Sequence, residues 1–239
     1  MELGYWNFKG MAESIRWLAA YLGIEITEVN PKSNEDWTAM KAEFGSPFPN
    51  LPYLVDGRFK LTESLAISDY MIKKAQREDL LGNYGIERVR IRQIEGVVDD
   101  IRRQFYMEIM VSKSDHEVLM KRLLQPDSKV QQKIKQLSDY LGDKEFFMGH
   151  ITWADFFFVY AAEVDGAMCM SLGFECPFSK HSNLRRLIER IKNLPGVKEL
   201  HDKRMGVEFF PSNIAPFKFL TIQQIVDQKK DIFGVYSSA

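Results

Sequence analysis

Residues 51–67 read LPYLVDGRFKLTESLAI, and this stretch decides the class of fold. The apolar run 51–55 is typical of a strand, Asp56-Gly57 of a two-residue hairpin turn, and residues 59–61 of the returning strand. Ser64 then precedes an apolar pattern of helical period. The stretch therefore predicts an antiparallel hairpin that leads directly into a helix capped by Ser64.

Two further strands, each followed by a helix, are expected before this hairpin. Residues 3–8 form a short apolar and aromatic run, and apolar residues at helical spacing follow over 15–22. Residues 24–29 alternate apolar and polar side chains, and a short helix is expected around Trp37. The order β-α-β-α-β-β-α predicts a small α/β domain over residues 1–80, with helices packed against a mixed sheet.

Residues 86–239 have an apolar period that is almost entirely helical. A long amphipathic helix is expected over 91–105. Thr152-x-x-Asp155 resembles a capping box, and the run 156–160 that follows is apolar all round, which is typical of a buried central helix. The second half of the chain is therefore predicted to be an all-α helical bundle domain.

Composition excludes several classes of partner. Lysine plus arginine total 32 and aspartate plus glutamate 33, so a net charge of -1 gives no reason to expect nucleic acid. No run of 18 apolar residues exists, and no basic flank with an apolar stretch opens the chain, so we expect a soluble, cytoplasmic protein without a membrane span. Cys169 and Cys176 are too few for a disulfide framework and are expected to be buried thiols.

Three features could hold an extended peptide. The N–H groups at a helix start, with the hydroxyl of Ser64, form a receptor for a carboxylate. A cis bond before Pro52 would turn the backbone of Leu51 outward, free to pair as with another strand. Trp37 and Lys41, spaced i, i+4, could offer an indole N–H and an ammonium to a second carboxylate. A simple N-cap, a trans proline and ordinary packing are the alternatives.

Tyr5 is the residue with a catalytic interpretation. Its hydroxyl could donate a hydrogen bond to a thiolate and so lower the pKa of that thiol, which at about 8.5 is otherwise mostly protonated at neutral pH. Half-buried packing in a strand is the alternative. Ser14 is a second candidate for activating a nucleophile, but it lies well into the first helix. No cysteine precedes Cys169, so thiol–disulfide exchange is not expected.

Five motifs resemble those of cytosolic glutathione transferases, and of their mu class in particular: Leu3-Gly4-Tyr5-Trp6, Trp37-x-x-x-Lys41, Phe48-Pro49-Asn50-Leu51-Pro52-Tyr53-Leu54, Asp56-Gly57 and Thr62-Glu63-Ser64-x-Ala66-Ile67. The resemblance implies a thioredoxin-like N-terminal domain that binds glutathione and a helical domain that binds the second substrate. Arg16-Trp17-Leu18 and Glu87-Arg88 resemble the alpha class instead. Two residues depart from the family pattern: Glu63 stands where the mu class, like the alpha and sigma classes, usually has glutamine, and Met11 stands where alpha enzymes carry a catalytic arginine.

The resemblance also implies a role for each matched residue. Tyr5 matches the catalytic tyrosine. Leu51 matches the residue whose backbone pairs with the cysteinyl part of glutathione. Asp99 or Asp100 matches an acidic residue that reaches the neighbouring subunit's glutathione, and Asp100 is the preferred candidate. Glu63 with Ser64 would grip the γ-glutamyl end, and Trp37 with Lys41 the glycyl carboxylate. The predicted glutathione-binding residues are Trp6, Trp37, Lys41, Asn50, Leu51, Pro52, Glu63, Ser64 and Asp100.

The implied function is conjugation of the glutathione thiolate to a small hydrophobic electrophile, by a cytoplasmic, homodimeric detoxification enzyme that needs no metal. Apolar side chains near Trp6, Phe8, Tyr106, Met107 and Phe209 are expected to line the second site. Residues 217–239 form an extension that could be a lid, a helix packed on the domain, or a contact for a protein partner. A non-catalytic structural or interaction subunit of a larger assembly and a glutathione-dependent isomerase are the alternative functions.

Overall fold

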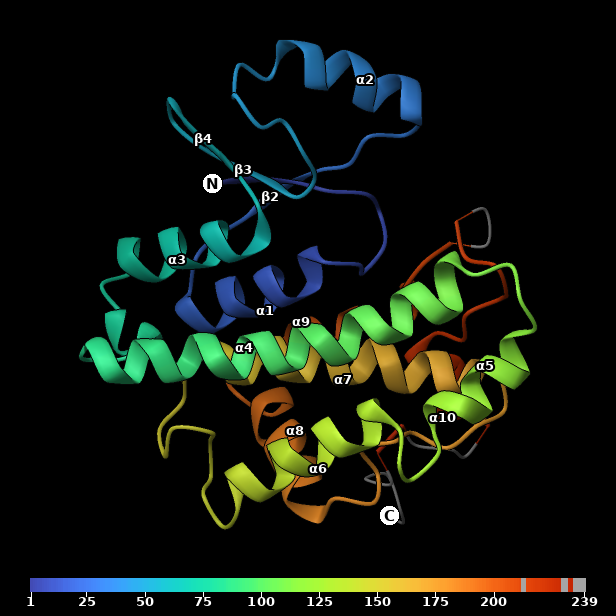
Figure 1. Cartoon of the computed structure of the whole chain (residues 1–239). Helices are drawn as coiled ribbons and strands as arrows, with labels where there is room; N and C mark the ends of the chain where they lie inside the picture. Colours follow the sequence, from blue (N-terminus) through green and yellow to red (C-terminus); the bar gives the residue numbers. More distant parts are fainter. Residues whose placement is uncertain (212–213, 229–231, 234–239) are drawn as a thin grey trace.

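A computed structural model describes residues 1–211, 214–228 and 232–233. It contains a small domain built on a sheet and a larger helical domain, with the sheet at one end of the molecule (Figure 1). The sheet has the strand order β2-β1-β3-β4. β1 pairs parallel with β2 and antiparallel with β3, which pairs antiparallel with β4. The strands are β1 (Glu2–Gly4), β2 (Thr27–Val29), β3 (Tyr53–Asp56) and β4 (Phe59–Thr62).

The helices follow the predicted order. The sheet domain contains α1 (Ala12–Leu22), α2 (Asn34–Glu43) and α3 (Ser64–Lys74). The chain then forms η1 (Glu78–Leu81), α4 (Gly85–Phe105), the π-helical turn η2 (Tyr106–Val111), α5 (His116–Leu123), α6 (Lys129–Leu141), α7 (Trp153–Ser171), α8 (Ser182–Lys192), α9 (Val197–Lys203) and α10 (Ile222–Asp227). The predicted fold class, a thioredoxin-like α/β domain followed by an all-α domain, is confirmed.

The strands are shorter than the sequence predicted. β1 ends at Gly4, so Tyr5 lies in the loop that follows, although its N–H still donates to the carbonyl of Val29 at 3.1 Å. The hairpin prediction was wrong by one residue. Asp56 pairs with Phe59, so Gly57 and Arg58 form the turn, and Gly57 supplies its positive φ of 60°.

α7 is the buried centre of the helical domain, as predicted. Its residues are buried from Trp153 to Cys169. The carboxylate of Asp155 accepts hydrogen bonds from the N–H of Thr152 at 2.7 Å and of Phe147 at 3.0 Å, which fixes the start of the helix and the preceding loop. Both cysteines are buried, as expected. Within the described ranges, none of the helices has the length and apolar character needed to cross a membrane.

α1 belongs to the cores of both domains. Ile15 and Ala19 pack in the core of the sheet domain, whereas Trp17 and Leu18 pack in that of the helical domain. Figure 1 shows α1 between the sheet and the larger group of helices. At Gly196 an added Cβ would lie 2.5 Å from the carbonyl oxygen of Ala20 at the end of α1. The backbones of the two domains therefore touch, and only glycine fits there.

The described part of the C-terminal extension packs on the helical domain. The ring of Phe219 stacks on Phe217 with centroids 4.7 Å apart, and the N–H of Leu220 donates to the hydroxyl of Ser171 at 2.8 Å. α10 follows, with Ile222 and Ile225 buried. Of the alternatives for this segment, packing on the domain is the one seen. Residues 229–231 and 234–239 of the extension lie outside the described residues.

Candidate functional site

Tyr5 is held at both ends. Its side chain is 7% exposed, and its hydroxyl accepts a hydrogen bond from the N–H of Met11 at 3.1 Å. The side-chain amide of Asn30 donates to its carbonyl oxygen at 2.8 Å. The ring of Phe8 meets the tyrosine ring edge to face, with centroids 5.6 Å apart. These contacts leave the hydroxyl in one fixed place, where its own proton can be donated.

The hydroxyl of Tyr5 is protonated at neutral pH. Burial raises its pKa above the ordinary 10.0, and the hydrogen bond from Met11 and the positive charges of Arg16 and Arg102 oppose that rise only in part. A protonated hydroxyl that already accepts one hydrogen bond can donate another to an anion. The arrangement therefore suits a donor that stabilises a thiolate, and it does not suit a general base.

Gly10 makes room for the tyrosine. Its φ is 42°, and an added Cβ would lie 2.4 Å from the hydroxyl oxygen of Tyr5. Ser14, the second candidate for activating a nucleophile, is fully buried, and its hydroxyl donates to the carbonyl of Met11 at 3.2 Å. Ser14 therefore supports the turn into α1, and Tyr5 holds the better position for chemistry.

The residues predicted to hold the γ-glutamyl end lie together at the start of α3. The side-chain amide of Asn50 donates to Glu63 at 3.1 Å. The prediction that Ser64 caps this helix was wrong. Glu63 takes the N-cap position with a φ of 72°, its carbonyl accepts from the N–H of Ile67 at 2.9 Å, and Ser64 is the first helical residue. No side chain caps α3, so its first N–H groups are open to a carboxylate.

A positive φ in a glutamate is uncommon and costs on the order of 1–3 kcal/mol, and such residues cluster at functional sites. The positive φ of Glu63 is therefore a second indication that the start of α3, with Asn50, is a functional site. The bond between Leu51 and Pro52 is cis, as the sequence analysis considered. Leu51 precedes β3, which begins at Tyr53, so it lies outside the strand ladder.

Trp37 and Lys41 lie on α2. The ring of Trp37 stacks on that of Tyr53 with centroids 6.4 Å apart, which attaches α2 to the strand after Pro52. Lys41, one turn further along α2, is exposed. The structure thus groups the predicted residues in three places: Tyr5 with Trp6, the corner at Asn50 and Glu63, and the face of α2.

A cavity of about 900 Å³ opens next to Trp6. Its lining is apolar at Trp6, Phe8, Pro211 and Ile214, and mostly polar at Asn7 and over the segment 30–35 that leads into α2. The ring of Phe210 packs on Phe8 at 5.8 Å and supports the apolar lining. A cavity with both apolar and polar lining can hold a hydrophobic molecule beside a polar one.

The predicted lining of the second site is only partly seen in this cavity. Trp6 and Phe8 line it, but Phe209 is fully buried beneath Lys9, whose ammonium lies 4.6 Å from its ring centre. Tyr106 and Met107 belong to the π-helical turn at the end of α4 and do not line it. The sequence pattern missed Pro211 and Ile214, because nothing in it relates them to the first loop.

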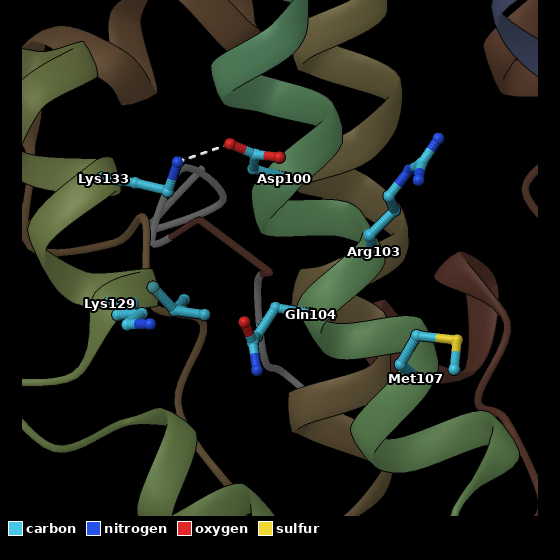
Figure 2. A pocket seen from close by; sticks show the side chains of 7 residues that line it. Asp100, Arg103, Gln104, Met107, Lys129 and Lys133 are labelled. Carbon is cyan, nitrogen blue, oxygen red and sulfur yellow. Dashed lines mark hydrogen bonds and ion pairs between the residues drawn. The ribbon is translucent and has the colours of Figure 1, made fainter.

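Asp100 lies in a groove between α4 and α6. Its carboxylate pairs with Lys133 at 2.5 Å, and both side chains point toward each other in Figure 2. The groove has a volume of about 250 Å³, and no residue of the sheet domain lines it. The neighbouring Asp99 pairs instead with Arg102 and Arg103. The role of Asp100 concerns a second subunit, so it stays a prediction.

Sequence analysis missed the groups that fix the loop after Tyr5. The guanidinium of Arg16 donates to the carbonyls of Phe8 at 3.2 Å and Lys9 at 3.1 Å, and it also pairs with Glu28 at 2.6 Å. Lys9 is 1% exposed and pairs with Glu163 of α7. A charged residue within an apolar run is the only sequence signal that Lys9 or Glu163 would be buried. No short motif could have connected the two, because they are 154 positions apart in the sequence.

The fold and the site define a class of protein: a thioredoxin-like domain with a fixed tyrosine hydroxyl after its first strand and a cis proline before its third, joined to a helical domain. The model of the glutathione S-transferase N-terminal domain matches residues 1–73, and that of the C-terminal domain matches residues 99–204. This chain belongs to the glutathione S-transferase family.

Three known proteins illustrate the similarity. The glutathione S-transferase class-mu 26 kDa isozyme 7 of Fasciola hepatica is 33% identical to this chain, and the match covers 83% of this chain and 86% of that protein. Glutathione S-transferase Mu 3 of Mus musculus is 35% identical to this chain, and the match covers 65% of this chain and 72% of that protein. The crystal structure of the glutathione S-transferase Blo t 8 has a TM-score of 0.78 at 25% identity, and the match covers 90% of this chain and 98% of that one. In the part of this chain that the structure describes, no group of three or more His, Cys, Asp or Glu side chains is placed to hold a metal ion.

Proposed function

We propose that this protein joins the thiolate of glutathione to an apolar electrophile, and that Tyr5 supplies the hydrogen bond that stabilises the thiolate. The observation that carries the proposal is the protonated, fixed hydroxyl of Tyr5 with a cavity of about 900 Å³ beside its loop. The hydroxyl donates to the sulfur, which lowers the thiol pKa and raises the fraction of the reactive anion. The sulfur then attacks the electrophilic carbon, a carbon–sulfur bond forms, and the leaving group departs.

Glutathione would span the three groups of predicted residues. The open N–H groups of α3 and the hydroxyl of Ser64 favour the α-carboxylate of the γ-glutamyl end, and the carboxylate of Glu63 favours its ammonium. The backbone of Leu51 before Pro52 is free to pair with the cysteinyl part, since it lies outside the ladder. Trp37 and Lys41 on α2 would hold the glycyl carboxylate. The apolar lining of the cavity, at Trp6, supports binding of the electrophile.

The test is glutathione-dependent conjugation of a generic aryl halide by the wild-type chain, with glutathione affinity measured in parallel. Turnover together with a lowered pKa of the bound thiol supports the enzyme. Weak binding without turnover contradicts it and favours a structural or interaction subunit. The isomerase alternative would show as binding and thiol ionisation without release of halide.

Removal of the Ser64 hydroxyl should weaken glutathione binding. We expect Ser64→Ala to raise KM for glutathione about five- to tenfold and to change kcat less, because one hydrogen bond to a charged group is lost, worth roughly 1–1.5 kcal/mol. The matched control is Ser182→Ala, since Ser182 is likewise the first residue of a helix, α8. Equal KM values for glutathione in the two variants would show that the Ser64 hydroxyl does not bind glutathione.

We also propose a homodimer that works in the cytoplasm as a detoxification enzyme. Phe48, Tyr84 and Ile86 are 73%, 84% and 82% exposed, an exposure that favours burial against a partner. A chain with only two cysteines, both buried, is typical of a reducing compartment, and an acceptor cavity with apolar lining suits foreign electrophiles. The role of Asp100 toward the second subunit's glutathione belongs to this same proposal.

The dimer predicts a clear change in mass. We expect the wild type to have the mass of a dimer in light scattering. The double variant Phe48→Ser, Ile86→Glu should have the mass of a monomer, because the contact would lose an aromatic ring and would bury an unpaired charge. Val118→Ser is the control, since Val118 is 61% exposed on α5, in the other domain from Phe48. A wild-type monomer, or a double variant that remains dimeric, would contradict this interface.

A further inference from the structure

We propose that Lys9 and Glu163 are positioning residues for the conjugation reaction: through their buried ion pair, the helical domain fixes the loop that sets the Tyr5 hydroxyl in place. This inference rests on the function proposed above. It assigns the pair no contact with either substrate. The carboxylate of Glu163 on α7 affects the reacting sulfur only indirectly: it holds Lys9, the loop of Lys9 places Met11, and Met11 places the hydroxyl of Tyr5.

The loop between Tyr5 and Met11 is itself part of the site. It begins at Tyr5 and ends at the N–H that donates to the Tyr5 hydroxyl at 3.1 Å. Within it the N–H of Phe8 donates to the carbonyl of Trp6 at 2.8 Å, which closes a tight turn. Gly10 lies against the tyrosine ring with no room for a side chain. A shift of this loop therefore moves the N–H donor and the wall of the ring together.

The side chain of Lys9 leaves this loop and enters the helical domain. Its ammonium pairs with Oε2 of Glu163 at 3.3 Å. The other carboxylate oxygen, Oε1, is bound by Lys192 of α8 at 3.0 Å and by Nε2 of His201 of α9 at 3.0 Å. One carboxylate on α7 thus joins the loop to three helices of the second domain.

Lys9 and Glu163 form an ion pair although both side chains are buried. Burial alone raises the pKa of Glu163, but the charges of Lys9, Lys192 and His201 outweigh it and hold that pKa well below its usual value. Burial lowers the pKa of Lys9, and the charges of Glu163 and Glu13 act in the opposite direction. A charged pair in a site of low dielectric has a strong preference for one geometry.

Backbone bonds hold the same loop from the same side. The N–H of Lys9 donates to the carbonyl of Glu208 at 2.8 Å, and that of Gly10 to Phe209 at 3.3 Å. These two bonds hold the backbone of the loop against the segment 208–209, and the ion pair holds the Lys9 side chain on the helical domain. Loss of the ion pair would leave the loop held by its backbone alone, so we expect Met11 to be less well placed relative to Tyr5.

The experiment compares two lysines on one carboxylate. Lys9→Met removes the ammonium at Oε2, and Lys192→Met removes one at Oε1; only Lys9 belongs to the loop. The thiolate absorbance of bound glutathione is followed against pH in each variant, with kcat, KM and Tm. We expect Lys9→Met to raise the pKa of the bound thiol by about one unit and to lower kcat at neutral pH about tenfold. KM for glutathione should change less than about twofold.

Lys192→Met is expected to lower Tm and to leave the thiol pKa and kcat as in the wild type. If both variants lower Tm alike and neither changes the thiol pKa, the ion pair is structural only and the inference is wrong. If Lys9→Met does not fold, Glu163→Gln takes its place, since it keeps the size and one acceptor oxygen, and an unchanged thiol pKa in that variant overturns the inference. A wild type that binds glutathione without lowering its thiol pKa rejects the proposed function instead.

Discussion

Tyr5→Phe is expected to lower kcat for glutathione conjugation about a hundredfold at neutral pH, because a single fixed donor to a developing or full anion is typically worth a factor of 10²–10³. The phenyl ring keeps the contacts with Phe8 and Gly10, so only the hydroxyl is removed. Without that donor, the pKa of the bound thiol should return toward about 8.5, and the missing activity should partly recover as the pH rises through that value.

The measurement is a pH–rate profile of the wild type and the variant, with glutathione affinity by calorimetry. Tyr140→Phe is the control: the hydroxyl of Tyr140 also donates to a methionine sulfur, that of Met148 at 3.6 Å, but Tyr140 lies on α6 and does not contact the loop of Tyr5 and Met11. We expect the control to keep the wild-type profile. A Tyr5→Phe variant with an unshifted profile would mean that another group stabilises the thiolate.

The largest effect on stability is expected from Glu163→Ala. Breaking a buried ion pair by removing one partner typically costs about 3–5 kcal/mol, because the other charge is left uncompensated. Here two lysines and a histidine would lose the same carboxylate. Burial lowers the folded-state pKa of Lys9, and loss of the opposing charge of Glu163 should lower it further. Below about 10.4 the unfolded chain then binds more protons than the folded variant, so the stability deficit of the variant should shrink as the pH rises toward that value.

Urea unfolding at neutral pH and at a pH nearer 10 tests both parts of this expectation. Asp139→Ala is the control, since Asp139 makes an exposed pair with Lys135 on α6, of the kind that contributes little to stability. The expectation fails if Glu163→Ala unfolds at the same urea concentration as this control. It fails in part if the deficit of Glu163→Ala is the same at both pH values.

Features set by neighbouring residues could be predicted from the sequence. Gly23 ends α1 with a φ of 66°, and Gly142 ends α6, because a left-handed or otherwise glycine-favoring residue stops a helix at the cap. Asp155 caps its helix three residues after Thr152, as the motif predicts. These are bonds between residues close in the chain, so local chemistry decides them.

Features set by distant residues could not be predicted. Ser64 was expected to cap α3, but the backbone of Glu63, bonded through its side chain to Asn50, takes that position. Pro211 completes a cavity that begins at Trp6. Lys9 has the sequence context of a residue at the end of a strand, and its partner Glu163 is 154 positions away. In each case, tertiary contacts override a local preference.

The position of α1 has a consequence for anyone who divides this chain. An isolated sheet domain would expose Trp17 and Leu18 to water, and an isolated helical domain would have a gap where these side chains lay. Gly196 against Ala20 also brings the backbones of the two domains into direct contact. We expect a single cooperative melting transition, insoluble fragments, and chimeras that fold only when α1, α7 and α9 come from the same parent.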